Sequence, residues 1–306
     1  MNYQAVFSVL LAARMWKNLP LLYLFLAGFA INYNGQHLDD LCLSLWAVVF
    51  ASVFMTHLNI ITDKELDAKS KPDLYKLLSQ DSRVTTAALI IEFVLCLAGI
   101  IALFIKSSFY PAVCISLFTA VAILYSYNFF TPKYAAQKRL KLYWWGHFGV
   151  MLTGYVSLWL GGYFCAIGNS AVLDNATLWW LLIFILVSLS EYSLFLLESS
   201  IDVKEEQAMQ LKTTVALLGS RNTAIVAILL CASAFAGFVL VAQVSPINKQ
   251  LLYIAFLPGI LLRLVTEMII LLLRAGKMNY LWKLKAPDII FNSTRLYTLI
   301  SILLLK

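Results

Sequence analysis

The chain has 306 residues, of which 61% are hydrophobic and 13% charged, with a mean hydropathy of +0.82 and a net charge of +7. Soluble domains have about 45–50% apolar and about 25% charged residues, so this composition excludes an ordinary water-soluble fold. The basic residues are scattered between apolar stretches, which also excludes a nucleic-acid-binding patch. We expect an all-α, polytopic membrane protein that forms a single domain over residues 1–306.

Nine apolar segments follow one another along the chain, after a short amphipathic helix expected in the first thirteen residues. Each is close to the roughly 20 residues that a bilayer-spanning helix needs. The predicted spans are residues 17–35, 41–61, 85–105, 110–130, 144–167, 177–197, 222–244, 250–273 and 288–305.

The basic residues outside these spans are very unevenly divided between the two sides of the membrane. Taking the amino-terminus and every second loop as one side gives 18 Lys and Arg residues there and three on the other. The three are Lys106, Lys249 and Lys306. This bias predicts a cytoplasmic amino-terminus and an external carboxy-terminus.

A first acidic cluster ends the second span and reads Asn59-Ile-Ile-Thr-Asp63-Lys-Glu65-Leu-Asp67. Asn59, Asp63 and Asp67 recur at every fourth position, so on a helix they share one face and drift by about 40° per step. Their oxygen atoms suit Mg²⁺, which prefers octahedral oxygen ligands and often shares itself with substrate phosphates.

A second acidic cluster ends the sixth span, with Glu198, Asp202 and Glu206 at the same spacing. Either cluster alone is equally well explained as a solvated helix end. Two clusters on the same side of the membrane indicate a shared site, because facing carboxylates repel one another unless divalent ions lie between them. We predict that the six residues bind Mg²⁺ and that a pocket for diphosphate lies between them.

The loop between the fourth and fifth spans supplies basic residues on the same side. Residues 133–141 contain four Lys and Arg side chains and no acid. Lys138, Arg139 and Lys141 are therefore predicted to bind the diphosphate, although the positive-inside rule is the better explanation for any one of them alone.

These motifs resemble those of the UbiA superfamily of intramembrane prenyltransferases. Asn59, Asp63 and Asp67 match the family's first motif, NxxxDxxxD, at every specified position. The acidic positions of the second motif are filled here by the second cluster, and Thr213 and Gly219 align with the stretch that follows it. Two further segments are similar to the family, Arg14-Met-Trp16-Lys17-Asn18 and Leu124-Tyr125-Ser126, so the resemblance covers essentially the whole chain.

The chain departs from the family pattern at several positions. Glu198 and Glu206 stand where the family has aspartates, and Gln210 stands where it has glycine. Lys71-Pro72 replaces the common Arg-Pro pair, and Lys71 joins the predicted diphosphate ligands. These changes suggest a divergent branch, and they leave the substrate more open than the metal site.

The resemblance implies nine transmembrane helices around a central cavity that opens to the cytoplasm, in the cell (inner) membrane. It implies Mg²⁺-dependent transfer of a prenyl group from a prenyl diphosphate to a small, aromatic acceptor, with Asp63, Asp67 and Asp202 as catalytic residues. We predict that Tyr125 and Tyr192 line the cavity.

Five charged side chains fall at membrane depth, where charge is costly and often functional. They are Glu92, Glu191, Arg263, Glu267 and Arg295. Arg263 and Glu267 are four residues apart and are expected to pair. Glu191 lies two turns before Glu198 and is expected to contact the acceptor, whereas His57 and His147 are expected to be packing residues.

Three other functions stay open on the sequence alone. A terpene cyclase or a polyprenyl-phosphate phosphoribosyltransferase would use the same scaffold. A transporter would need polar residues along a path through the bilayer, whereas this chain gathers its acids at one face.

Overall fold

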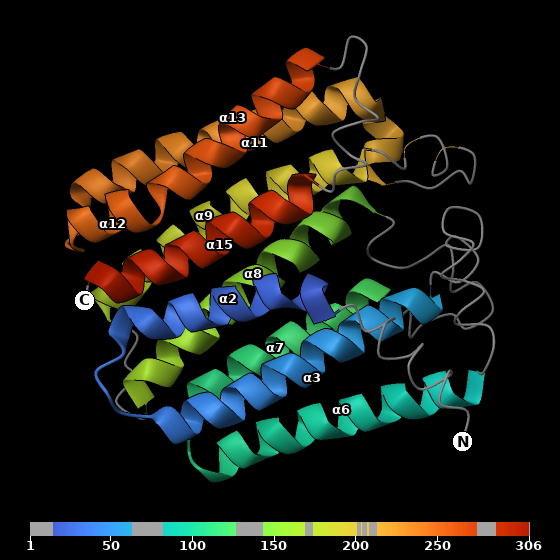
Figure 1. Cartoon of the computed structure of the whole chain (residues 1–306), viewed down its shortest axis with the longest axis vertical. Coiled ribbons are helices and arrows are strands. Elements are labelled where there is room, and N and C mark those ends of the chain that lie inside the picture. The colour runs from blue at the N-terminus through green and yellow to red at the C-terminus, as the bar shows by residue number, and fades with distance from the viewer. Residues whose placement is uncertain are drawn as a thin grey trace.

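The computed structural model describes residues 15–62, 82–126, 143–168, 174–200, 213–273 and 286–305, together with Val203 and Gln207. The long helices of these residues lie side by side in one bundle (Figure 1). They are α2 (Met15–Asn32), α3 (Leu38–Thr62), α6 (Ser82–Ile105), α7 (Phe109–Ser126), α8 (Trp144–Ile167), α9 (Asn175–Ser199), α11 (Thr214–Val244), α12 (Lys249–Ala255), α13 (Leu257–Leu273) and α15 (Ala286–Leu305).

Each predicted apolar segment is mostly helical in the part of it that the structure describes, but α2 ends at Asn32, so residues 33–35 of the first predicted span are not helical. Helices satisfy their backbone hydrogen bonds internally, which lipid requires because it offers no partners. Among the described residues, seven helical segments are long and apolar enough to cross a membrane, with α12 and α13 counting as one. In α2 and α15 the fully described apolar stretches, Asn18–Asn32 and Ile289–Leu305, are shorter, and the amphipathic helix expected at residues 1–13 lies outside the described residues.

The seventh segment begins earlier than the predicted residue 222. Thr213 caps α11, and its hydroxyl accepts a hydrogen bond from the backbone N–H of Ala216 at 3.1 Å. The chain then kinks at Gly219, where φ is +71°, a conformation that glycine adopts without a Cβ clash. The apolar pattern alone marked only the part of α11 that follows this kink.

Successive spans run in opposite directions, with α12 and α13 counted as one, and α15 closes the bundle (Figure 1). In Figure 1, α15 lies between α9 and α2, and it packs against both. The helices α8 and α9 are mostly covered by other helices, with 67% of each span buried, whereas α6 lies at the edge with 28% buried. The residues nearest the centre therefore come from α8 and α9.

Glycines let α2 and α8 approach closely. A Cβ built on Gly28 would collide with the carbonyl of Trp159, and one built on Gly162 would collide with the carbonyl of Phe25. Close backbone approach at small residues is a common way for helices to associate in lipid, where burial of apolar surface provides no drive.

We predict that Gly162→Ala destabilises the protein by about 1–3 kcal/mol, because the added methyl group meets the backbone of α2. Gly149→Ala, on the same helix, is the matched control, since nothing lies within 4 Å of its added Cβ. Unfolding in mixed detergent micelles measures both variants. Equal stability of the two would contradict the close packing.

The eighth span is broken between α12 and α13. Pro258 has no N–H to donate to the carbonyl of Ile254, one turn earlier. The hydroxyl of Tyr297 on α15 donates to that carbonyl instead, at 2.9 Å. A side chain from a neighbouring helix thus restores the hydrogen bond that the proline removes.

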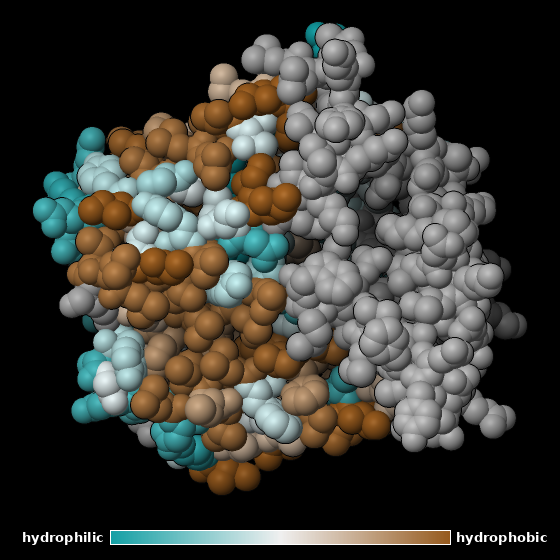
Figure 2. Space-filling view, in the orientation of Figure 1, coloured by the Kyte–Doolittle hydropathy of each residue, from teal (hydrophilic) through white to brown (hydrophobic). Residues whose placement is uncertain are grey.

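The described surface is a broad apolar band with hydrophilic side chains gathered at one end (Figure 2). The connections α2–α3 and α6–α7 lie at that end, where Lys106 pairs with Asp39 and, at 3.0 Å, with Asp40. The hydrogen bond to Asp39 and the one to Asp40 raise the pKa of Lys106. Such an arrangement suits a bilayer boundary, because paired charges lie outside the apolar band.

Candidate active site

The described residues of both acidic clusters lie at the same end of the bundle. The helices α3, α7 and α9 end there, and α8 and α11 begin there (Figure 1). Asn59 is in the last turn of α3, and its side-chain oxygen accepts a hydrogen bond from Ser126 at the end of α7, at 3.4 Å. Glu198 is half-buried in the last turn of α9. The described member of each cluster therefore lies at the same end of the bundle, as predicted for both clusters.

The opening of α2 is tied to the same region. Thr56 donates a hydrogen bond to the side-chain oxygen of Asn18 at 2.9 Å, and Thr56 lies one turn before Asn59. Asn18 belongs to the segment that resembles the start of UbiA proteins. This contact explains how that segment helps to hold the end of α3.

The remaining predicted ligands lie outside the described residues. They are Asp63, Asp67, Asp202, Glu206, Lys71, Lys138, Arg139 and Lys141. Among the residues that the structure describes, no group of three or more His, Cys, Asp and Glu side chains is arranged to hold a metal. Asn59 and Glu198 are both oxygen donors, which is the ligand chemistry that Mg²⁺ prefers, so the described part of the site fits that ion.

Four aromatic side chains from α7, α8 and α9 meet near the same end of the bundle. The imidazole of His147 on α8 lies 5.7 Å from the ring of Tyr125, 5.5 Å from that of Tyr192 and 4.9 Å from that of Phe195, measured between centroids. Its Nδ1 is 3.2 Å from the hydroxyl of Tyr192. The sequence singled out both tyrosines, but it carried no signal that His147 would join them or that Phe195 would take part.

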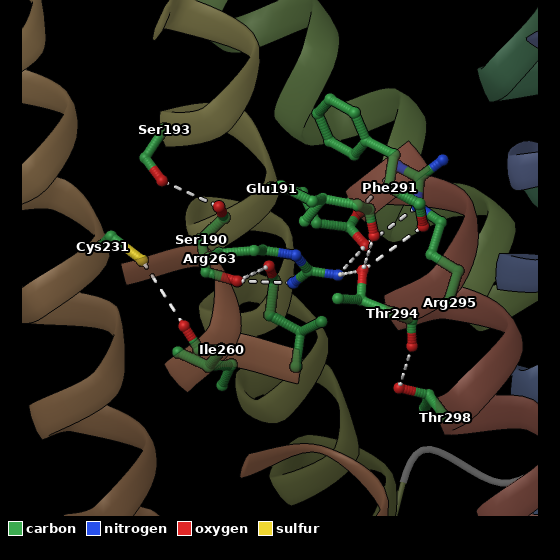
Figure 3. Close-up of polar contacts among 12 residues, drawn as sticks. Ser190, Glu191, Ser193, Cys231, Ile260, Arg263, Phe291, Thr294, Arg295 and Thr298 are labelled. Atoms are coloured by element: carbon green, nitrogen blue, oxygen red, sulfur yellow. Dashed lines mark hydrogen bonds and ion pairs between the residues drawn. The ribbon is translucent and has the colours of Figure 1, made fainter. Parts of the chain in front are cut away.

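Glu191 lies at the centre of a buried charge cluster (Figure 3). Arg295 of α15 donates to its two carboxylate oxygens from Nε and Nη2, each at 2.9 Å, and Arg263 of α13 donates to one of them at 3.0 Å. The guanidinium of Arg295 also lies over the ring of Tyr155, 4.9 Å from its centroid. Both oxygens of Glu191 are thus engaged within the bundle, whereas the sequence suggested a contact with the acceptor.

The expected pair between Arg263 and Glu267 is wrong. Arg263 donates instead to Glu191, to Ser190 at 2.8 Å and to Thr294 at 2.8 Å. The i, i+4 spacing places the two side chains on one face of α13. The guanidinium nevertheless donates its hydrogen bonds to side chains of α9 and α15.

Glu267 pairs with Ser193 on α9. The hydroxyl of Ser193 lies 2.7 Å from the carbonyl of Ser190 and 2.5 Å from Oε1 of Glu267. A hydroxyl has one proton to donate, so both contacts are hydrogen bonds only when the carboxyl of Glu267 carries a proton of its own. The geometry therefore favours a neutral Glu267 beside the charged Glu191 cluster.

His57 is a packing residue, as expected. It is 1% exposed, and its Nδ1 lies 2.7 Å from a carboxylate oxygen of Glu92 on α6. This buried pair links α3 to α6, on the far side of α3 from its acidic cluster.

We predict opposite outcomes for two isosteric changes. Glu191→Gln destabilises the protein by about 3–5 kcal/mol, because it leaves two buried guanidinium groups without their counter-charge. Glu267→Gln changes stability by less than about 1 kcal/mol, because the amide donates to Ser193 as the carboxyl does. Unfolding in mixed micelles at neutral pH measures both, and similar effects would refute this assignment of charge.

Fold and site together define a multi-pass helical membrane protein in which Asn59 and Glu198, the described residues of the two acidic motifs, lie at the same end of a closed bundle. The sequence profile of the UbiA prenyltransferase family matches residues 21–285, and the chain belongs to this family. No curated protein matches the chain by sequence.

Solved structures of UbiA proteins share the fold. A UbiA homologue from Archaeoglobus fulgidus, solved with GPP and Mg²⁺, is 15% identical with a TM-score of 0.69, over 96% of this chain and 99% of its own. A UbiA homologue from Aeropyrum pernix K1 in its apo state is 17% identical with a TM-score of 0.66, over 95% and 97%. A digeranylgeranylglyceryl phosphate synthase is 15% identical with a TM-score of 0.63, over 98% and 99%.

Proposed function

We propose that the protein transfers a prenyl group from a prenyl diphosphate to a small aromatic acceptor, in a Mg²⁺-dependent reaction. The observation that carries this proposal is that Asn59 and Glu198, one from each acidic motif, lie at the same end of the bundle in a chain of the UbiA family. The homologue from A. fulgidus has been solved with GPP and Mg²⁺ and with DMAPP and Mg²⁺, which supports the donor class.

The six acidic-motif residues hold the metal in this proposal. They are Asn59, Asp63, Asp67, Glu198, Asp202 and Glu206. When bound, Mg²⁺ neutralises the charge that develops on the departing diphosphate. Lys71, Lys138, Arg139 and Lys141 bind the same group as hydrogen-bond donors and complete its charge balance.

The chemistry is a substitution at the allylic carbon of the donor. The bond from C1 to the diphosphate oxygen breaks, the diphosphate leaves with the electron pair, and the allylic carbon gains positive charge. A ring carbon of the acceptor then forms the new bond and loses its proton. Aromatic faces such as that of Tyr125 stabilise the cation, and the apolar helices keep water from capturing it.

The proposal also includes the predicted orientation of the chain, its membrane and its single domain. The active site faces the cytoplasm, with the amino-terminus inside and the carboxy-terminus outside, and the membrane is the cell (inner) membrane. The whole chain forms one domain. The positive-inside bias of the loops supports this orientation.

Turnover by the purified protein tests the proposal. GPP and longer prenyl diphosphates are supplied with Mg²⁺, with and without 4-hydroxybenzoate or 1,4-dihydroxy-2-naphthoate, and diphosphate release and prenylated product are measured. We expect both only with acceptor present, and neither in excess EDTA. Release that needs no acceptor and yields a cyclic terpene would indicate a cyclase instead.

Substitutions of the motif aspartates test the site. We predict that Asp63→Ala and Asp202→Ala each lower kcat by at least about 1000-fold, because the diphosphate loses its charge stabilisation. Both variants insert and fold like the wild type, as judged by yield and thermal unfolding. Ser199→Ala, next to Glu198 but outside the every-fourth-residue pattern, serves as the control with near-normal turnover. Near-normal turnover of either aspartate variant would remove that residue from the site.

A further inference from the structure

The aromatic group of Tyr125, His147, Tyr192 and Phe195 suggests a role for His147. Tyr125 and Phe195 are half-buried, whereas His147 is 8% exposed and Tyr192 is 2% exposed. The imidazole is therefore less accessible than the rings of Tyr125 and Phe195 that it contacts, and Tyr192 is the most buried of the four.

Each accessible ring is next to one of the acidic motifs. Tyr125 precedes Ser126, whose hydroxyl donates to Asn59 of the first motif. Phe195 lies three residues before Glu198, the first residue of the second motif, and so shares its face of α9. His147 contacts both rings, with an interplanar angle of 36° to each.

The imidazole of His147 also contacts Tyr192. The hydroxyl of Tyr192 is 3.2 Å from Nδ1, and the tyrosine ring packs edge-on against Phe148 with centroids 5.1 Å apart. Tyr192 also belongs to a small apolar cluster with Leu196, Ala224 and Ile270, which joins α9 to α11 and α13. The imidazole therefore contacts a tyrosine that is itself packed among buried side chains.

We propose that His147 is a positioning residue for prenyl transfer: it sets the separation and tilt of Tyr125 and Phe195, and Tyr192 fixes the imidazole in turn. This role rests on the proposed function. The two rings form the walls nearest to the reacting allylic carbon, and their faces stabilise its positive charge only when they point at it. His147 acts through these rings and needs no contact with the substrate.

Kinetics of matched variants test this role, with the full chain in detergent, Mg²⁺ and the prenyl diphosphate and acceptor that the wild type uses best. His147→Phe keeps a ring but removes the ring nitrogen that lies beside the tyrosine hydroxyl, and Tyr192→Phe removes that hydroxyl. Tyr163→Phe is the control, since Tyr163 is a buried tyrosine of α8 that packs among Phe164, Trp180 and Phe184 near the other end.

We expect each site variant to lower kcat about tenfold or more, because small misplacements of groups around a transition state have effects of this size. KM for the donor stays within about twofold, since the groups that bind the diphosphate are unchanged. The double variant is no worse than either single one, because both remove the same restraint. Tyr163→Phe has wild-type kinetics.

Other outcomes overturn the role of His147. Unchanged kcat in His147→Phe, with or without a lower unfolding temperature, would make the residue purely structural. Effects that multiply in the double variant would show that the two side chains act separately. A wild-type protein that consumes no prenyl diphosphate with Mg²⁺ would overturn the proposed function and this role together, whereas an active wild type with unaffected variants would overturn this role alone.

Discussion

The buried carboxylate of Glu191 and its two arginine partners are the interaction on which the rest of the bundle depends. Charge inside a lipid-embedded bundle is stable only when it is paired and hydrogen-bonded. Glu191 meets this condition by accepting from Arg295 and Arg263, which come from two different helices. The relative rotation of α9, α13 and α15 is therefore fixed, because a turn of any one would leave a charge unpaired.

The directions of the site side chains on α9 depend on these ion pairs. The helix that carries Glu191 also carries Tyr192, Phe195 and Glu198, at increasing height toward the motif end. With α9 held by salt bridges below and by the cluster around Tyr192 above, these side chains have fixed directions. On the other side, the contact of Ser126 with Asn59 ties α7 to α3. Separate sets of contacts thus hold Asn59 and Glu198, the described residues of the two motifs, at the same end of the bundle.

The helices and the end of the bundle that carries the motifs were predictable from the sequence, because both depend on local patterns. Apolar length marks a span, and an oxygen every fourth residue marks one helical face. The partners of Arg263 were not predictable in this way. The i, i+4 rule pointed to Glu267, but the pairing was decided by helices far away in the chain, which only the packed bundle brings together.

The aromatic group shows the same limit of sequence-based prediction within the site. Tyr125 and Tyr192 stood out because they lie near motif residues in sequence. His147 gave no such signal, since its place beside Tyr125 and Phe195 follows from the packing of α8 between α7 and α9. The start of α11 was missed for a related reason, because a capping threonine begins a helical turn ahead of the kink at Gly219, outside the predicted apolar stretch.

The order of the charged residues along the chain has a consequence for how the protein is made. Glu191 is synthesised well before Arg263 and Arg295, so α9 enters the membrane while its counter-charges are still absent. Until α13 and then α15 arrive, the nascent chain holds a carboxylate without its final partners in a place that does not tolerate one. The cluster is thus complete only when α15, the last of its three helices to be made, has entered the membrane.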